Sequence, residues 1–159
     1  MTEQTILIDK EQEATNEPFS LTDKQAEAVR EAIPYRYFQF FGGSGSGKTF
    51  MILYIIITRA LKRTSSHLIL RRTLQSAKVS ICHQGIPEVV NVCFPGFEIV
   101  SASGVKPVHP GVIVYNKAEN RYTFSNGSYI LIGGTEDKAK LQKLLGPGWS
   151  TIYFNEATE

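Results

Sequence analysis

Apolar positions along the chain fall into short runs separated by segments of helical spacing. The aromatic-rich run YRYFQFF (35–41) and the run HLILRR (67–72) predict buried strands. Between them a strongly apolar stretch from Lys48 to about Arg63 predicts a helix that Ser65 and Ser66 end. Upstream, Thr22 is a candidate cap for a helix with the interior DKQAEAVREAI, which Pro34 terminates. The segment LQSAKVSICHQGIPEVVNVCF predicts one or two helices, interrupted near Gly85-Ile86-Pro87.

From Pro95-Gly96 to Gly134 the pattern becomes β-like. Asn126-Gly127 predicts a hairpin turn, because a type I′ turn needs positive φ at both central positions. Further on, DKAKLQKLL (137–145) has helical spacing and a short apolar run at 151–154 predicts a final strand. The alternation of strands and helices favours a parallel, three-layer α/β sheet with a β-hairpin insertion. The three runs that predict strands within the β-like region are GVIVYN (111–116), RYTF (121–124) and SYILIGG (128–134).

Composition limits the class of protein but does not indicate a particular function. The chain has 159 residues, with 42% hydrophobic and 20% charged positions, as expected for one globular domain. A net charge of +2 gives no global argument for binding nucleic acid or membrane, and the longest apolar run (50–57) is far shorter than the ~20 residues that span a bilayer. Cys82 and Cys93 form neither a disulfide framework nor a zinc spacing, so a reduced, cytoplasmic setting is expected. Residues 1–18, polar and without a signal-peptide pattern, are expected to form a flexible arm.

A glycine-rich loop carries the strongest chemical signal. Its sequence matches G-x-x-x-x-G-K-[ST], and it lies between a predicted strand and a predicted apolar helix, which disfavours a simple flexible linker. Glycines let backbone N–H groups curl around a polyphosphate, and the helix amino end adds a positive dipole. The lysine is expected to contact the β- and γ-phosphates of ATP, and the threonine hydroxyl to ligate Mg²⁺. The predicted nucleotide-binding residues of this loop are Gly42, Gly43, Ser44, Gly45, Ser46, Gly47, Lys48 and Thr49.

The end of the last predicted strand supplies a second candidate group. Nucleotide-hydrolysing enzymes commonly end such a strand with Asp-Glu, where this chain has Asn155-Glu156. Glu156 is the predicted catalytic base, acting with Lys48. Asn155 is the predicted second Mg²⁺ group beside Thr49, although an amide oxygen brings no charge. A surface strand end without a role is the alternative.

Gln25 and the arginines allow two interpretations each. Thr22 and Gln25 have the T-x-x-Q spacing of a capping box, which explains them structurally. An amide also matches the donor and acceptor edge of adenine, with Phe19 as a possible stacking partner for the base. Arg71 and Arg72 end a predicted parallel strand, where they are either phosphate or DNA contacts or a solvated strand end.

Several of these segments, in order, resemble the N-terminal ATPase region of the large subunit of tailed-phage terminases. The similar segments are FSLTDKQAEAV, FFGGSGSGKT, HLILRRTLQSAKVSI, YTFSNGSYILIGG and KLQKLLGPGWSTIYFNEATE, over about 19–159. The resemblance implies a P-loop ATPase of the RecA-like, additional-strand catalytic-glutamate type, with ATP and Mg²⁺ as cofactors and Gln25 on the adenine. It also implies packaging of double-stranded DNA into proheads in the host cytoplasm. The implied partners are a terminase small subunit, a portal protein and further copies in a ring.

Departures from the family pattern leave alternatives open. Many terminases have Arg where this chain has Ser44, and the family has a charged Asp where it has Asn155. Relatives continue past the final strand into the central strand of the sheet and a nuclease domain. We therefore expect 19–159 to be a partial ATPase domain, weakly active or inactive when isolated. A helicase-type ATPase and a fragment that only binds nucleotide are the alternatives.

Overall fold

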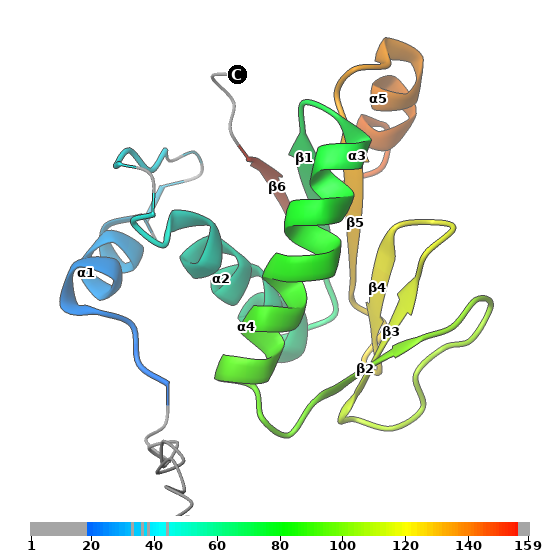
Figure 1. The fold of residues 1–159 in the computed structure, drawn as a ribbon, viewed down its shortest axis with the longest axis horizontal. Coiled ribbons are helices and arrows are strands. Elements are labelled where there is room, and N and C mark those ends of the chain that lie inside the picture. Colours follow the sequence, from blue (N-terminus) through cyan, green and yellow to red (C-terminus); the bar gives the residue numbers. More distant parts are fainter. Residues whose placement is uncertain (1–18, 33, 36, 38, 44, 156–159) are drawn as a thin grey trace, which may run out of the picture.

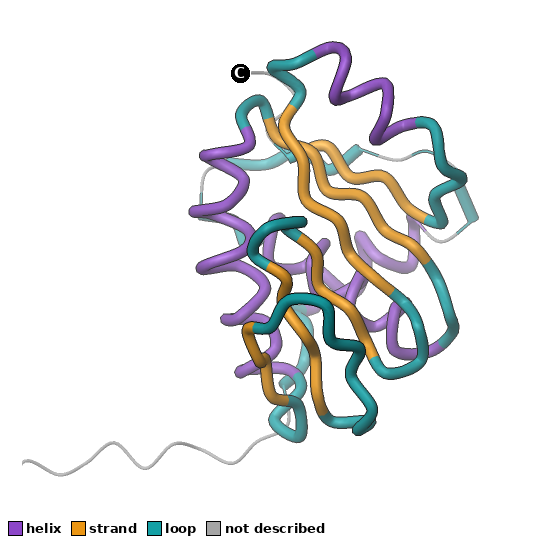
Figure 2. Tube along the Cα trace, turned by 90° about the vertical axis from the view of Figure 1, so that its right-hand side faces the viewer, coloured by secondary structure: helices purple, strands orange, loops and turns teal. Residues whose placement is uncertain are grey.

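The computed structural model describes residues 19–32, 34, 35, 37, 39–43 and 45–155, so the predicted arm at 1–18 lies outside the described residues. Helices pack on both faces of a six-stranded sheet (Figures 1 and 2). The predicted α/β class is confirmed. The helical elements are α1 (Asp23–Ala32), α2 (Lys48–Lys62), α3 (Leu74–Ala77), η1 (Lys78–Gly85), α4 (Ile86–Cys93) and α5 (Lys138–Leu145). The strands are β1 (Ser66–Arg71), β2 (Glu98–Ser101), β3 (Val112–Asn116), β4 (Arg121–Phe124), β5 (Tyr129–Gly134) and β6 (Thr151–Phe154).

The sheet is mixed, in the order β2-β3-β4-β5-β1-β6, whereas the sequence pattern favoured a parallel one. β1 runs parallel to β5 and β6, and β2 runs parallel to β3. β3, β4 and β5 are antiparallel neighbours, because short turns connect them and leave no room for a crossover helix. The predicted hairpin is confirmed and is continuous with the main sheet through β5. Its turn is not type I′, because Gly127 has a positive φ of 85° and Asn126 does not. The short strand β2, half of it polar, has no prediction of its own in the sequence pattern.

The predicted strand at 35–41 is wrong for the part of it that the structure describes. Residues 35, 37 and 39–41 lie in no strand, and Tyr35, Tyr37 and Phe41 are 67%, 82% and 83% exposed. A strand needs a neighbour for its backbone hydrogen bonds. Among the described strands, β6 pairs with β1 alone, and no described residue of 35–41 belongs to the sheet.

The main core lies between the sheet and a layer formed by α2, η1 and α4. Leu53, Ile56 and Ile57 of α2 are fully buried with Ile69 of β1 and Ile130 of β5. Each buried side chain of this size stabilises the fold by roughly 1.5–3 kcal/mol. On the opposite face, a Cβ placed on Gly133 would lie 2.6 Å from Leu144 Cδ1, which shows how closely α5 packs on β5.

The segment 74–93 is one continuous helical rod with a π-helical middle (Figure 1, green). Thr73 caps its amino end by accepting a hydrogen bond from Ser76 N. The predicted break near Gly85 appears as a change from π to α winding. Pro87 does not disrupt the helix, because it lies in the first turn of α4. A Cβ on Gly85 would lie 2.7 Å from Leu53 Cδ1, so glycine permits the close approach to α2.

The β4–β5 turn holds the carboxyl end of α2. Asn126 Nδ2 and Ser128 Oγ both donate to the Ala60 carbonyl at 2.7 Å. Ser128 Oγ also contacts the Arg63 carbonyl at 3.0 Å and accepts from Ser65 N at 3.0 Å. Carbonyls at a helix end have no partner within the helix, and this turn supplies one. The far end of α2 is thereby tied to the sheet, which fixes the direction in which its amino end points.

Buried His67 makes the stability of the fold sensitive to pH. Its ring is 1% exposed on β1, with Nε2 at 2.9 Å from Ser65 Oγ. Burial, reinforced by the charges of Arg59 and Arg63, lowers the pKa of His67 from 6.5 to about 4. Between these values the unfolded chain binds more protons than the folded one. Burial of neutral His67 therefore costs no stability above pH 6.5, and the free energy of unfolding falls as the pH drops toward 4.

We expect the free energy of unfolding to fall by up to roughly 3 kcal/mol between pH 7 and pH 4 because of His67. Urea unfolding at several pH values measures this loss. In His67→Leu the free energy of unfolding should depend less steeply on pH, because no proton is taken up at this position. His109 is an exposed loop residue, so His109→Gln is the matched control. This variant should keep the steep dependence of the unfolding free energy on pH. Identical slopes in His67→Leu and the unchanged protein would contradict the assignment.

Candidate nucleotide-binding site

The glycine-rich loop leads directly into the first turn of α2, as its sequence predicts. Gly45 and Gly47 have φ of 76° and 73°, the left-handed region that favours glycine. A Cβ on Gly43 would meet nothing within 4 Å, so the loop is open on that side. Ser44 lies outside the described residues. The loop is thus an exposed, curved segment of backbone at the amino end of a long helix.

Lys48 folds back into this loop. Its Nζ donates to the carbonyl oxygens of Gly42 and Gly43, each at 2.7 Å, and to Ser46 Oγ at 2.9 Å. The first turn of α2 contains no acidic residue, and its cap, Gly47, has no side chain to accept from the free N–H groups. An ammonium group and a helix amino end therefore add positive potential at one point, which favours an anion there.

The loop and the end of β6 meet at Asn155. Thr49 Oγ1 donates to Asn155 Oδ1 at 3.2 Å, and the Tyr153 hydroxyl donates to the same oxygen at 2.8 Å. Asn155 is 6% exposed, and its backbone N–H donates to the Leu70 carbonyl at 2.8 Å. The structure thus brings together two side chains that the sequence predicted as one magnesium site. Glu156, the predicted catalytic base, lies outside the described residues.

The donor set at this point fits a magnesium ion that a polyphosphate also holds. Mg²⁺ prefers oxygen ligands, and Thr49 and Asn155 present a hydroxyl and an amide oxygen. In the described part of the chain no group of three or more His, Cys, Asp or Glu residues is placed to hold a metal by itself. The two oxygens are neutral, so these two groups bring no negative charge to a bound Mg²⁺.

Gln25 acts as the predicted cap and also lies against the loop. Thr22 N donates to Gln25 Oε1 at 3.1 Å, and Gln25 N donates to Thr22 Oγ1 at 3.3 Å, which is a complete capping box. A Cβ on Gly47 would be 2.9 Å from Gln25 Nε2. The capping role is confirmed, and the adenine contact stays a prediction.

Aromatic packing fixes α1 beside the amino end of α2 (Figure 1). The Phe19 ring lies 5.5 Å from the Phe50 ring and 5.3 Å from the Tyr54 ring, both on α2. Phe19, considered as a stacking partner for a nucleotide base, thus packs against the protein itself. Its contribution to the site is to hold the Gln25 segment in place.

The two arginines after β1 have different surroundings. Arg71 Nη1 donates to Ser80 Oγ and, at 3.5 Å, to the Ser76 carbonyl, so Arg71 anchors the helical rod to the sheet. Arg72 is exposed. Of the two, Arg72 has the accessible guanidinium, and its proposed contact with phosphate or DNA stays a prediction.

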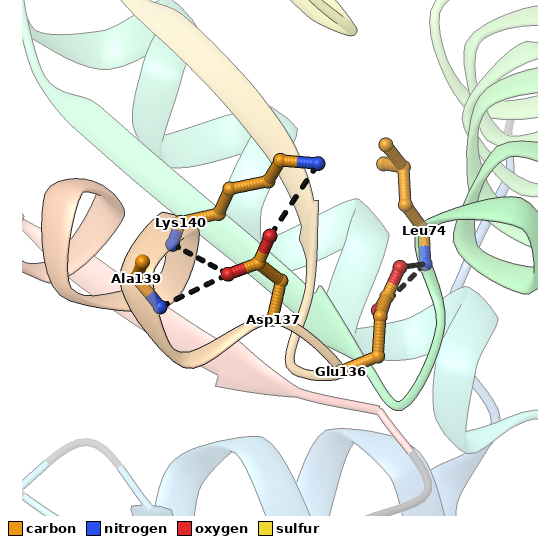
Figure 3. A network of polar contacts seen from close by, with 5 residues as sticks. All are labelled: Leu74, Glu136, Asp137, Ala139 and Lys140. Carbon is orange, nitrogen blue, oxygen red and sulfur yellow. Dashed lines mark hydrogen bonds and ion pairs between the residues drawn. The ribbon is translucent and has the colours of Figure 1, made fainter.

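Acidic residues after β5 have structural roles (Figure 3). Both oxygens of Glu136 accept from Leu74 N, at 3.0 and 3.1 Å, which joins the start of α3 to the end of β5. Asp137 caps α5 by accepting from Lys140 N and Ala139 N. The Lys140 backbone N–H is the largest cause that lowers the pKa of Asp137. These carboxylates are committed to the ends of helices.

Sequence reasoning missed two features beside Thr49. The first is Tyr153, which strand alternation places on the same face as Asn155, two positions further on. The second is a pocket of about 180 Å³ between α2 and the helical rod. Its polar lining residues on the rod, Ser80, Gln84 and Glu88, recur every four positions and so lie on one side of it. The signal for both in the sequence is periodicity, of two along β6 and of four along the helical rod.

None of the described helices has the length and apolar character needed to cross a membrane.

The fold and the site define an α/β protein in which a glycine-rich loop, a helix amino end and a strand-end amide meet at one point. The chain belongs to the family described as terminase large subunit, T4likevirus-type, N-terminal, which matches residues 39–159. This confirms the resemblance seen in the sequence. The matched range begins after Gln25. Searches of curated proteins and of solved structures found no match to the chain.

Proposed function

We propose that this chain is the ATP-binding and ATP-hydrolysing part of a phage terminase large subunit that drives double-stranded DNA into proheads. The observation that carries the proposal is the contact between Thr49 and Asn155, which joins the glycine-rich loop to the end of β6 across 106 positions. P-loop motors bring these two points together to hold Mg²⁺ between protein and phosphate. The family assignment supports the same function.

Lys48 is proposed to bind the β- and γ-phosphates. Its three ammonium protons are directed at Gly42, Gly43 and Ser46 Oγ, so the charge already lies at the centre of the loop. A phosphate oxygen needs to replace only the weakest acceptor, the Ser46 hydroxyl, to reach it. The backbone N–H groups from Gly42 to Thr49 complete the phosphate cradle.

Thr49 and Asn155 are the proposed Mg²⁺ groups, and Glu156 the proposed base for the attacking water. Bound Mg²⁺ would neutralise charge on the phosphates. Thr49 Oγ1 can offer a lone pair to the metal while it keeps its proton and donates it to Asn155 Oδ1, which already lies at 3.2 Å. Because Asn155 is neutral, the affinity of the site for Mg²⁺ should depend on the nucleotide.

Gln25 is the proposed adenine contact. Its Oε1 already accepts from Thr22 N, which leaves the Nε2 protons beside Gly47 to donate to a ring nitrogen of the base. One amide can therefore cap α1 and recognise adenine at the same time.

Partners follow from the family and are part of the proposal. Double-stranded DNA is the substrate that is moved, and the exposed Arg72 is a candidate for its phosphates. A terminase small subunit, a portal protein and a homo-oligomeric ring in the host cytoplasm are the expected setting.

A competition experiment tests the nucleotide site. A fluorescent ATP analogue is bound to the chain in the presence of Mg²⁺ and displaced with ATP, inorganic triphosphate or adenosine. We expect ATP and triphosphate to compete and adenosine to compete roughly a hundredfold less well, because charged hydrogen bonds to phosphate dominate binding. Equal competition by adenosine and ATP would contradict a phosphate cradle.

A further inference from the structure

We propose that Tyr153 is a positioning residue that orients the Asn155 side-chain amide, so that its oxygen faces Thr49 and the magnesium position. The inference rests on the proposed function and adds a residue that the glycine-rich loop and the strand-end pair do not include. It arises from one contact, the Tyr153 hydroxyl at 2.8 Å from Asn155 Oδ1.

The geometry makes Tyr153 well placed for this role. Tyr153 and Asn155 are two positions apart at the end of β6, so both side chains lie on the face that carries α2. The Tyr153 ring packs against the main core, which limits how far its hydroxyl can move. The Asn155 backbone is held by its hydrogen bond to Leu70, and its side chain is almost entirely buried. Within this frame, rotation of the amide about its last bond is the main remaining freedom.

That rotation matters only because the residue is asparagine. An aspartate presents two equivalent oxygens, and turning it over changes nothing. An asparagine turned over would present N–H protons to Thr49 and to a cation, where an acceptor is required. A neutral amide at this position therefore needs a neighbour that favours one orientation over the other.

A tyrosine hydroxyl favours the required orientation. Its oxygen lone pair is delocalised into the ring, which makes the phenol a better donor than acceptor. The 2.8 Å separation matches an O–H···O hydrogen bond. Thr49, once its oxygen binds Mg²⁺, can only donate. The hydroxyls of Thr49 and Tyr153 then both need Oδ1, rather than the amide nitrogen, as their neighbour. One net hydrogen bond is equivalent to about a fivefold change in an equilibrium, so loss of the Tyr153 bond should reduce the ratio of the two amide orientations about fivefold.

A four-variant Mg²⁺ titration tests the inference. The unchanged chain, Tyr153→Phe, Asn155→Asp and the double variant bind a fluorescent ATP analogue while Mg²⁺ is raised from zero. Tyr153→Phe should move the Mg²⁺ midpoint about fivefold upward and leave binding in EDTA unchanged. In the Asn155→Asp background the same substitution should move the midpoint less than twofold, because aspartate needs no orientation. An equal shift in both backgrounds, or no shift in either, would overturn the proposal.

A second measurement needs no nucleotide. In the free chain, nuclear Overhauser effects are recorded between the Asn155 side-chain NH₂ protons and the Tyr153 ring or Thr49 methyl protons. We expect them to be weak in the unchanged chain and stronger in Tyr153→Phe, where both orientations become populated. Strong effects in the unchanged chain would place the nitrogen toward Tyr153 and refute the inference. Absence of Mg²⁺-dependent nucleotide binding in the first experiment would instead count against the proposed function, and this measurement would still decide the role of Tyr153.

Discussion

Lys48→Ala is expected to weaken ATP binding roughly a hundredfold or more, while the thermal stability of the chain stays nearly unchanged. Each charge-assisted hydrogen bond to phosphate contributes about 1.5–3 kcal/mol, and the ammonium is expected to make two of them. The fold depends little on Lys48, because the hydrogen bonds of its ammonium group to described residues lie within the loop, to Gly42, Gly43 and Ser46. Titration with a fluorescent ATP analogue and a thermal melt measure the two quantities.

Lys62→Ala is the matched control for this prediction. Lys62 has the same charge and belongs to the same helix, but it is exposed in the last turn, far from the loop. The Lys62→Ala variant should bind the ATP analogue with the same affinity as the unchanged chain. If Lys48→Ala bound ATP normally, the phosphate role of the loop would be wrong. If both variants lost affinity equally, the effect would come from net charge rather than from position.

Gly134→Ala is expected to destabilise the fold by roughly 3 kcal/mol. A Cβ at this position would lie 2.4 Å from Leu74 N and 2.0 Å from Glu136 Oε2. Overpacking of this kind costs about 1–3 kcal/mol, and displacing Glu136 would also leave the Leu74 N–H without its acceptor. Figure 3 shows these two residues meeting at the start of α3. The start of α3 would have to separate from the end of β5.

Urea unfolding of Gly134→Ala and of Gly148→Ala measures this effect. Gly148 has a φ outside the left-handed region, and an added Cβ there would meet nothing within 4 Å. Gly148→Ala should therefore leave the free energy of unfolding within about 0.5 kcal/mol of the unchanged value. Similar losses in both variants would show that the close approach to Leu74 and Glu136 does not set the requirement for glycine at position 134.

Local pattern predicted most of the helices and strands well. α2 depends on an apolar stripe over a long run, and β6 was predicted with the bounds that the structure has. The capping box of α1 was readable because its two residues are three positions apart. In each case the interactions that decide the structure lie within one helical turn or one strand, where sequence pattern records them.

The failures involve partners that pattern does not record. Residues 35–41 have the composition of a strand, yet their described residues lie outside the sheet, because composition does not record which backbone edges meet. The antiparallel pairing of β3 with β4, and the pairing of β5 with β1, depend on which edges meet in space. The π winding of η1, which packs against α2 and β5, was likewise not predicted from its own sequence.

The sequence by itself determined the loop, the helix behind it, the amide at Asn155 and the family, because these reside in residue types at fixed spacing. The tertiary structure decided which groups meet. It brought Asn155 to Thr49 across the fold, turned Lys48 back into its own loop and placed the Tyr153 hydroxyl on the Asn155 oxygen. Hydrogen bonds between distant positions depend on distances of tenths of an ångström, which arise only when packing places the helices on the sheet.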